Sequence, residues 1–122
     1  MLHVAPVFTV VSVASAIDWY EEVLGFEATF RNEPGGPESV FYAVLRCGDV
    51  SLHLVREADM GSAAGEGACT FDVADYDRRV ASCEAAGAHF YIEPGTRIPT
   101  GARTFGVTDP DGNKLAFVEV NG

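Results

Sequence analysis

Gly106-Val-Thr-Asp-Pro-Asp-Gly-Asn-Lys-Leu-Ala-Phe-Val-Glu-Val120 is the most informative stretch of this 122-residue sequence. Its centre, Asp109–Asn113, is dense in turn-forming residues. Pro110 fixes φ at the first central turn position, and Gly112 tolerates a positive φ. The stretch therefore predicts a strand, a tight turn and a largely buried last strand from Lys114 to Val120.

The N-terminal part of the chain predicts a buried strand followed by an amphipathic helix. Val4–Val13 is rich in valine, which is typical of a strand. Ser12 or Ser15 can cap the following helix, and Gly25 is suited to end it. The apolar stripe of this helix consists of Ile17, Tyr20, Val23 and Leu24.

Three strands are predicted after this helix, at Phe26–Arg31, Ser39–Arg46 and Val50–Arg56. The last two form a hairpin whose turn is centred on Gly48 and Asp49. Strand alternation then predicts one core face with Phe41, Ala43, Leu45, Leu52 and Leu54. The opposite face mixes apolar, aromatic and polar groups, as a ligand-facing surface would: Tyr42, Val44, Arg46, Ser51, His53 and Val55.

The same order of elements occurs a second time. Glu57–Glu66 shows no periodicity and predicts a linker. After it we expect a strand at Gly67–Val73, a helix capped by Asp75 and ending near Ala86, strands at His89–Glu93 and Arg103–Thr108, and the last strand. Because one such unit is small for an independent core, we expect a single domain over 1–122, with modules at about 1–60 and about 65–122.

The charge balance limits the possible partners. Lysine and arginine number 8 and acidic residues 18, which gives a formal net charge of −10. Such a surface repels nucleic acid phosphates and anionic lipids, and it attracts cations. The same charge also serves simply to keep a protein soluble. We therefore expect no nucleic acid and no membrane partner.

The three cysteines, Cys47, Cys69 and Cys83, are far apart and form no CxxC motif. This pattern argues against a disulfide framework or a structural zinc site, and it favours reduced thiols in a cytoplasmic protein. No charged leader precedes an apolar run, so we expect no signal peptide.

Two motifs resemble a known family. Val10-Val-Ser-Val-Ala-Ser-Ala-Ile-Asp-Trp-Tyr-Glu-Glu-Val-Leu-Gly-Phe26 is similar to the first strand and helix of the vicinal oxygen chelate superfamily, which includes glyoxalase I, extradiol dioxygenases, fosfomycin resistance enzymes and bleomycin resistance proteins. Thr108-Asp-Pro-Asp-Gly-Asn113 resembles its last hairpin. The resemblance implies an α+β fold of two βαβββ modules, the glyoxalase/bleomycin resistance/dioxygenase fold, whose sheets form a cup with helices outside.

The resemblance also implies four positions that hold a divalent metal in the enzymes of the family. The sequence register places them at Ala5, His53, Ala68 and Ala116. An alanine methyl cannot bind a metal, so only His53 offers a ligand. His3 has the parity of Ala5, but the helix register argues against it. We therefore expect neither a metal nor another cofactor.

The same alternation assigns the residues that face the cup. We expect ligand contacts from Val7, Thr9, Tyr42, Val44, His53, Val55, Thr70, Asp72, Thr104, Gly106 and Val118. His53 would bind a ligand, act as an acid or base, or simply be a hydrogen-bonded residue of the sheet. Tyr42 would stack on a flat ligand or serve in ordinary packing. Asp72 would meet a cationic group or lie in water at the rim.

These observations favour a metal-free binding protein similar to the bleomycin resistance proteins. It would sequester a small, cationic or planar natural product without chemistry, confer antibiotic resistance, and form a homodimer with two sites. The alternative is a divalent-metal-dependent or acid/base lyase, isomerase or dioxygenase of the same superfamily. A third possibility is an accessory domain with an unused cup.

Overall fold

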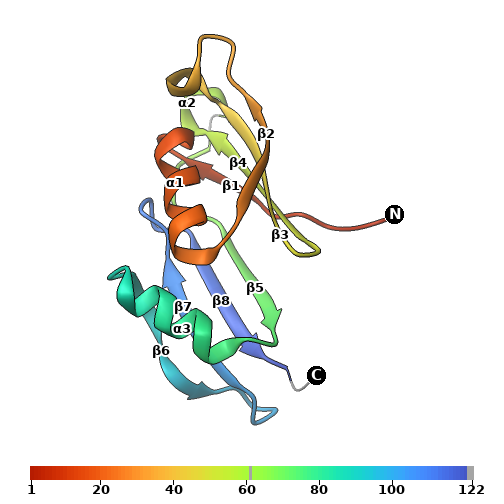
Figure 1. Ribbon diagram of the computed structural model, residues 1–122, viewed down its shortest axis with the longest axis vertical. Helices are drawn as coiled ribbons and strands as arrows, with labels where there is room; N and C mark the ends of the chain where they lie inside the picture. The colour runs from red at the N-terminus through yellow and green to blue at the C-terminus, as the bar shows by residue number, and fades with distance from the viewer. Residues whose placement is uncertain (61, 121–122) are drawn as a thin grey trace.

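The computed structural model describes residues 1–60 and 62–120, and it contains two four-stranded mixed sheets (Figure 1). The first has the order β1-β4-β3-β2, with β1 (Val7–Val10), β2 (Glu27–Asn32), β3 (Tyr42–Cys47) and β4 (Val50–Arg56). The second has the order β5-β8-β7-β6, with β5 (Ala68–Val73), β6 (His89–Arg97), β7 (Arg103–Thr108) and β8 (Lys114–Glu119). Strand β1 pairs in parallel with β4, and β5 pairs in parallel with β8. All other strand pairs are antiparallel.

Each sheet carries a helix between its first two strands. These helices are α1 (Val13–Leu24) and α3 (Tyr76–Ala85), and Figure 1 shows them on the same side of the molecule. Two short helices, η1 (Pro37–Ser39) and α2 (Glu57–Met60), lie in the connections. We call β1–β4 with α1 module 1, and β5–β8 with α3 module 2. The predicted α+β fold of two βαβββ modules is confirmed.

Helix α1 begins and ends where its sequence predicts. The Ser12 hydroxyl accepts a hydrogen bond from the Ser15 N–H at 3.2 Å, which identifies Ser12 as the N-cap. Gly25 adopts the left-handed conformation, with φ of 73°. The predicted stripe is buried, and Tyr20 has no exposed surface. These local signals orient α1 with its apolar face on the sheet.

The turn of the last hairpin is tied to module 1 through Asp109. This carboxylate is 3% exposed and accepts four hydrogen bonds. The Tyr20 hydroxyl donates from α1 at 2.9 Å, and the backbone N–H groups of Asp111 and Asn113 each donate at 2.9 Å. The side-chain amide of Asn113 donates the fourth, at 2.8 Å. A buried carboxylate is tolerated when it is bonded in this way.

Asn113 extends this network to both first strands. Its amide also donates to the Thr9 carbonyl on β1 at 3.1 Å, and its amide oxygen accepts from the Gly67 N–H just before β5 at 2.8 Å. A Cβ at Gly67 would lie 2.4 Å from the Phe8 ring, so this approach requires glycine. The last hairpin therefore holds the two modules together.

Helix α3 does not use the cap that its sequence predicts. Asp75 forms no capping hydrogen bond; its carboxylate instead pairs with Arg78 at 2.9 Å and with Arg79 at 2.8 Å. Its backbone, with φ of −112° and ψ of 46°, lies outside the extended conformation of a normal N-cap. Asp75 thus stands at the predicted N-cap position, but its carboxylate pairs with two guanidinium groups and makes no capping bond.

Several boundaries differ from expectation. Strand β3 starts at Tyr42 and not at Ser39, which belongs to η1. Strand β1 starts at Val7 and not at Val4, because Pro6 has no N–H to pair, and Val13 already belongs to α1. Strand β6 continues through Pro94 to Arg97, with two register shifts that let it pass this residue. The predicted linker contains the single turn α2.

The core runs through both modules. Four of the five residues predicted for the inner face of the first hairpin, Ala43, Leu45, Leu52 and Leu54, have 0% exposure, whereas Phe41 is half-buried and lies before β3. In module 2, Phe105 stacks on Phe117 at 4.8 Å between ring centroids. Phe26 of module 1 approaches Phe71 of module 2 at 6.2 Å. In the part of the chain that the structure describes, no helix has the length and apolar character needed to cross a bilayer.

We predict that Asp109→Asn lowers the free energy of unfolding by about 2–3 kcal/mol, because the new amide group meets donors where the carboxylate accepted hydrogen bonds. Urea unfolding at neutral pH measures this loss. Asp49→Asn is the matched control, since Asp49 is exposed in the corresponding turn of module 1. An equal effect of both substitutions would contradict this role of Asp109.

The same network predicts a specific alkaline instability. Burial and the neighbouring Asp109 raise the pKa of Tyr20 well above its ordinary value of 10.0. The unfolded chain therefore ionises first, so the contribution of Tyr20 is complete below pH 10 and decreases above it, by up to about 1.4 kcal/mol per pH unit.

Urea unfolding between about pH 8 and pH 11 tests this dependence by comparing wild type with Tyr20→Phe. Burial also raises the pKa of Cys69 and of Cys83 to about 11, so both proteins lose stability from these thiols. We expect wild type to lose more above pH 10, which narrows its advantage over Tyr20→Phe. Parallel pH profiles would refute the assignment.

Candidate functional site

The residues predicted to face the cup form one patch on each module. In module 1, Val7 pairs with His53, and His53 pairs with Val44. The adjacent row holds Thr9, Val55 and Tyr42. We call these six residues the module 1 face. The prediction that Val44 lies opposite His53 is confirmed, because the Gly48–Asp49 turn sets that register.

The module 2 face repeats this arrangement. One row holds Thr70, Ala116 and Gly106, and the next holds Asp72, Val118 and Thr104. Thr70 and Asp72 are exposed, whereas Gly106 and Thr104 are buried. The Thr104 hydroxyl donates to the Phe117 carbonyl at 2.7 Å, so it serves the sheet. The structure thus groups the candidates by module.

A shallow cavity of about 460 Å³ lies where the module 2 face meets the start of β4. It is lined in part by Thr70 and Asp72 of β5, by Ser51 of β4, and by Val4 and Pro6 of the N-terminal segment. Tyr42 and His53 lie outside this lining. The hollow in one chain therefore involves only part of the predicted site.

Tyr42 and His53 form the most defined polar pair of the module 1 face. The Tyr42 hydroxyl is hydrogen-bonded to His53 Nδ1, and the two rings meet edge to face at 5.5 Å and 79°. Both side chains are half-buried. The sequence places them on one face, and they are diagonal neighbours in the register. His53 is thus a hydrogen-bonded residue of the sheet on the module 1 face, and its roles in ligand binding or acid/base chemistry stay predictions.

The four positions of the implied metal site are related by the repeat. Ala5 lies two residues before Val7, which pairs with His53. Ala68 lies two residues before Thr70, which pairs with Ala116. Ala5 and His53 therefore have the same relation in the strand register of module 1 as Ala68 and Ala116 have in module 2.

The side chains at these positions do not fit a divalent metal. Three of them are methyl groups, and His53 alone supplies a donor. His3 lies exposed in the segment before β1. Among the residues that the structure describes, no three His, Cys, Asp or Glu side chains are grouped so as to hold a metal.

Two aromatic residues of these faces were not predicted. Phe30 on β2 is 52% exposed and pairs with Val44, which extends the module 1 row. Tyr91 on β6 lies over Gly106, where a Cβ would come within 2.7 Å of the Tyr91 ring. The Lys114 ammonium lies 5.6 Å from the centroid of the same ring.

Both aromatic residues follow register shifts, one between Ala28 and Phe30 and one between Phe90 and Ile92. A bulge shifts the alternation of side chains along a strand and leaves no clear signal in the sequence. Strand alternation alone therefore could not assign Phe30 and Tyr91 to these faces. The aromatic residues themselves, in predicted outer strands, were the only available indication.

Comparisons with known proteins agree with this architecture. A family model described as Glyoxalase/Bleomycin resistance protein/Dioxygenase superfamily matches residues 1–117. A comparison with curated proteins gave no significant match.

Several solved structures share the fold. TioX from Micromonospora sp. ML1 has a TM-score of 0.82 at 24% identity, covering 96% of this chain and 97% of its own. A bleomycin-binding protein complexed with bleomycin has a TM-score of 0.76 at 20% identity, covering 98% of both chains. Lactoylglutathione lyase from Agrobacterium tumefaciens has a TM-score of 0.73 at 22% identity, covering 96% of this chain and 92% of its own.

We predict that Tyr42→Phe changes the tautomer of His53. With the Tyr42 hydroxyl donating to Nδ1, neutral His53 carries its hydrogen on Nε2. Without that donor, the Nδ1–H form should gain population. Two-bond ¹H–¹⁵N spectra of the imidazole rings at about pH 8 measure this, with His3 and His89, both exposed, as references. Identical His53 spectra in both proteins would show that the hydroxyl does not set the tautomer.

Proposed function

The chain belongs to the Glyoxalase/Bleomycin resistance protein/Dioxygenase superfamily, and we propose that within it this protein binds a small drug-like natural product without changing it chemically. The observation that carries the proposal is the set of side chains at the positions of the implied metal site. Ala5, Ala68 and Ala116 cannot coordinate a cation, and they leave room for an organic ligand. The fold shared with a bleomycin-binding protein in complex with bleomycin supports the same function.

The faces offer the chemistry of a binding site for a planar or cationic compound. Phe30 and Tyr91 present partly exposed rings, and Val7 adds exposed aliphatic surface. The Tyr42–His53 pair supplies a hydrogen-bond donor or acceptor within this apolar setting. Asp72 places a carboxylate on β5, and the net charge of −10 favours a cationic ligand. Burial between the two faces would supply the affinity, with these polar groups fixing orientation.

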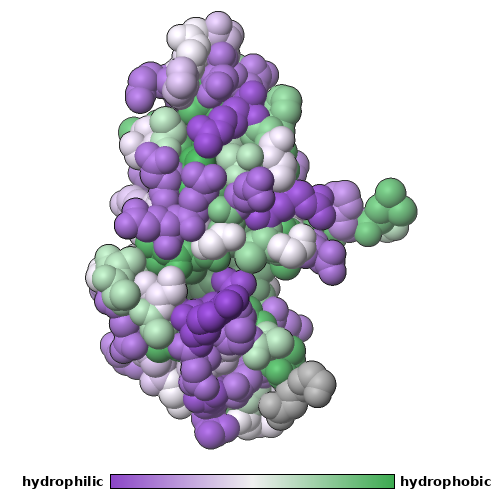
Figure 2. Space-filling view, viewed as in Figure 1, coloured by the Kyte–Doolittle hydropathy of each residue, from purple (hydrophilic) through white to green (hydrophobic). Residues whose placement is uncertain are grey.

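We further propose that two copies of the chain complete the site. Within one chain the candidate residues form separate patches, so a second copy facing them would enclose a ligand. The N-terminal Met1, Leu2 and Val4 expose apolar surface and project from the body (Figures 1 and 2). The buried core common to both modules supports one domain over residues 1–122. Three free thiols fit a cytoplasmic location.

An enzymatic function is the second candidate, and the Tyr42–His53 pair favours it. A tyrosine hydroxyl bonded to an imidazole is able to move a proton at neutral pH. The shared fold with lactoylglutathione lyase is compatible with this alternative. Such chemistry would be acid/base, because the donor set does not fit a metal.

We predict that cationic compounds of the bleomycin type raise the melting temperature of this protein. At 100 times its dissociation constant, a ligand should add about 2.7 kcal/mol to the free energy of unfolding. Asp72→Asn should weaken a cationic ligand severalfold, whereas Asp18→Asn should not, since Asp18 is an exposed carboxylate on α1. Thermal shift and calorimetric titration provide these measurements.

The same preparations separate the two functions. If the protein binds stoichiometric metal, and His53→Ala removes both the metal and the turnover, the function is metal-dependent catalysis and not binding. Turnover without metal that His53→Ala abolishes would establish the acid/base alternative. Equal ligand affinity in both aspartate variants would move the site away from the module 2 face.

A further inference from the structure

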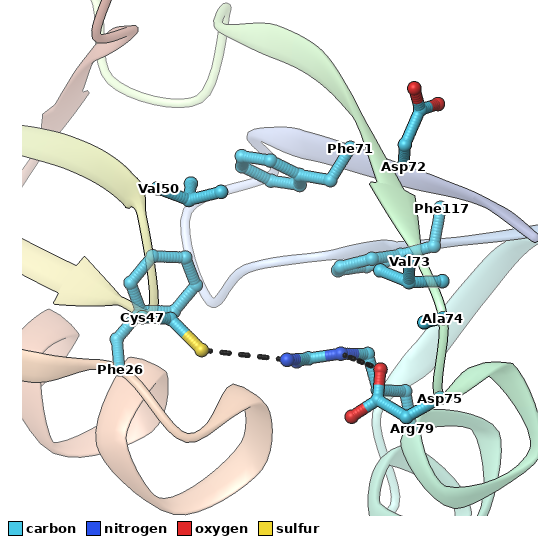
Figure 3. A pocket seen from close by; sticks show the side chains of 10 residues that line it. All are labelled: Phe26, Cys47, Val50, Phe71, Asp72, Val73, Ala74, Asp75, Arg79 and Phe117. Carbon is cyan, nitrogen blue, oxygen red and sulfur yellow. Dashed lines mark hydrogen bonds and ion pairs between the residues drawn. The ribbon is translucent and has the colours of Figure 1, made fainter. Parts of the chain in front are cut away.

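A second hollow lies between the two modules. This junction cavity has a volume of about 170 Å³ (Figure 3). Its apolar walls include Phe26 between α1 and β2, Val50 on β4, Phe71 on β5 and Phe117 on β8. Apolar cavities of about 150 Å³ hold a benzene ring. The junction cavity is therefore large enough for a single aromatic ring.

One side of the junction cavity is polar and has a fixed geometry. The Arg79 guanidinium donates to Asp75 Oδ1 at 2.8 Å, to the Leu24 carbonyl at 3.0 Å and to Cys47 Sγ at 3.4 Å. Figure 3 shows this group between the thiol and the carboxylate, beside the apolar walls. These contacts hold the guanidinium plane in place and engage three of its five N–H bonds. The remaining N–H bonds are donors that a bound oxygen acceptor can use.

The charges around the junction cavity favour a neutral occupant. Arg79 is paired with Asp75, so an anion would compete with a carboxylate already in place. A cation would face the guanidinium itself. Asp72 contributes its backbone to the lining, but Figure 3 shows its carboxylate pointing away from the cavity.

The junction cavity adjoins the shallow cavity of the module 2 face, and Val50, Phe71 and Asp72 line both. On β5, Thr70 and Asp72 belong to the module 2 face, whereas Phe71 and Val73 point to the opposite side and line the junction cavity. A molecule in the junction cavity would thus contact both modules without touching the Tyr42–His53 pair.

We infer that the junction cavity is a second binding site, specific for a small neutral aromatic compound that carries a carbonyl oxygen. The ring lies among Phe26, Val50, Phe71 and Phe117, where offset or edge contacts between rings are favourable. The carbonyl oxygen accepts from the Arg79 guanidinium. Because Arg79 also bonds the end of α1, the bound compound joins the two modules and stabilises their arrangement. This inference does not depend on the function proposed for the cup.

The probe for this site is 4-fluoroacetophenone, observed by ¹⁹F NMR during titration with the full-length protein. We expect saturable binding with a dissociation constant of about 1 mM, as for a fragment of this size. Val50→Phe fills the cavity and should raise the constant at least tenfold. Because Val50 also lines the shallow cavity of the module 2 face, Thr70→Phe is the control: it adds a ring to that cavity alone and should leave the constant within twofold of wild type.

A second readout uses the wild-type protein alone, so it does not depend on the folding of a variant. At ten times its dissociation constant, the probe should slow alkylation of Cys47 by iodoacetamide about elevenfold, measured by mass spectrometry of peptides. Cys69, which is half-buried and outside this lining, is the internal reference and should react at an unchanged rate.

Three results would overturn the inference. The first is the absence of saturable binding of the probe. The second is loss of binding in Thr70→Phe, which would place the compound in the shallow cavity of the module 2 face. The third is equal protection of Cys47 and Cys69 from alkylation. Failure of the function proposed for the cup is measured separately, with the Asp72→Asn and Asp18→Asn variants.

Discussion

The buried carboxylate of Asp109 is the constraint on which the rest of the structure depends. An ionised group at 3% exposure is costly unless donors surround it, and the four that do come from α1 and from its own turn. With Asn113 bonded to β1 and to the segment before β5, these bonds have one geometry only. The arrangement of the two modules, and hence of every site between them, depends on these buried hydrogen bonds.

Given that relation, a single strand serves two different surfaces. Strand β5 directs Thr70 and Asp72 to the candidate cup and Phe71 to the junction cavity. One surface is partly exposed and acidic, and the other is an apolar hollow edged by a fixed guanidinium. The alanines at three of the implied metal positions concern only the first surface. The two sides of β5 therefore offer different ligand chemistry.

Much of the fold was predictable because its signals are local. Turn residues fixed the hairpin register that sets Val44 opposite His53, and a serine and a glycine marked the ends of α1. Prediction failed where local preference met a competing partner. Asp75 pairs with arginines and makes no capping bond to α3, and β6 continues past Pro94 by shifting its register. The bulges that place Phe30 and Tyr91 have no period that counting could detect.

The sequence by itself determined the repeated βαβββ order, the alternation that assigns most of the two faces, and the alanines at three of the positions that the resemblance implies for metal ligands. Only the tertiary structure decided which polar groups meet: Tyr42 with His53, Tyr20 with Asp109 and Arg79 with Cys47. The physical reason is the distance along the chain over which each interaction acts. Periodicity and turn preference act between neighbours in the chain, whereas the partner of a buried polar group is selected by packing, which in the Tyr20–Asp109 bond joins residues 89 positions apart.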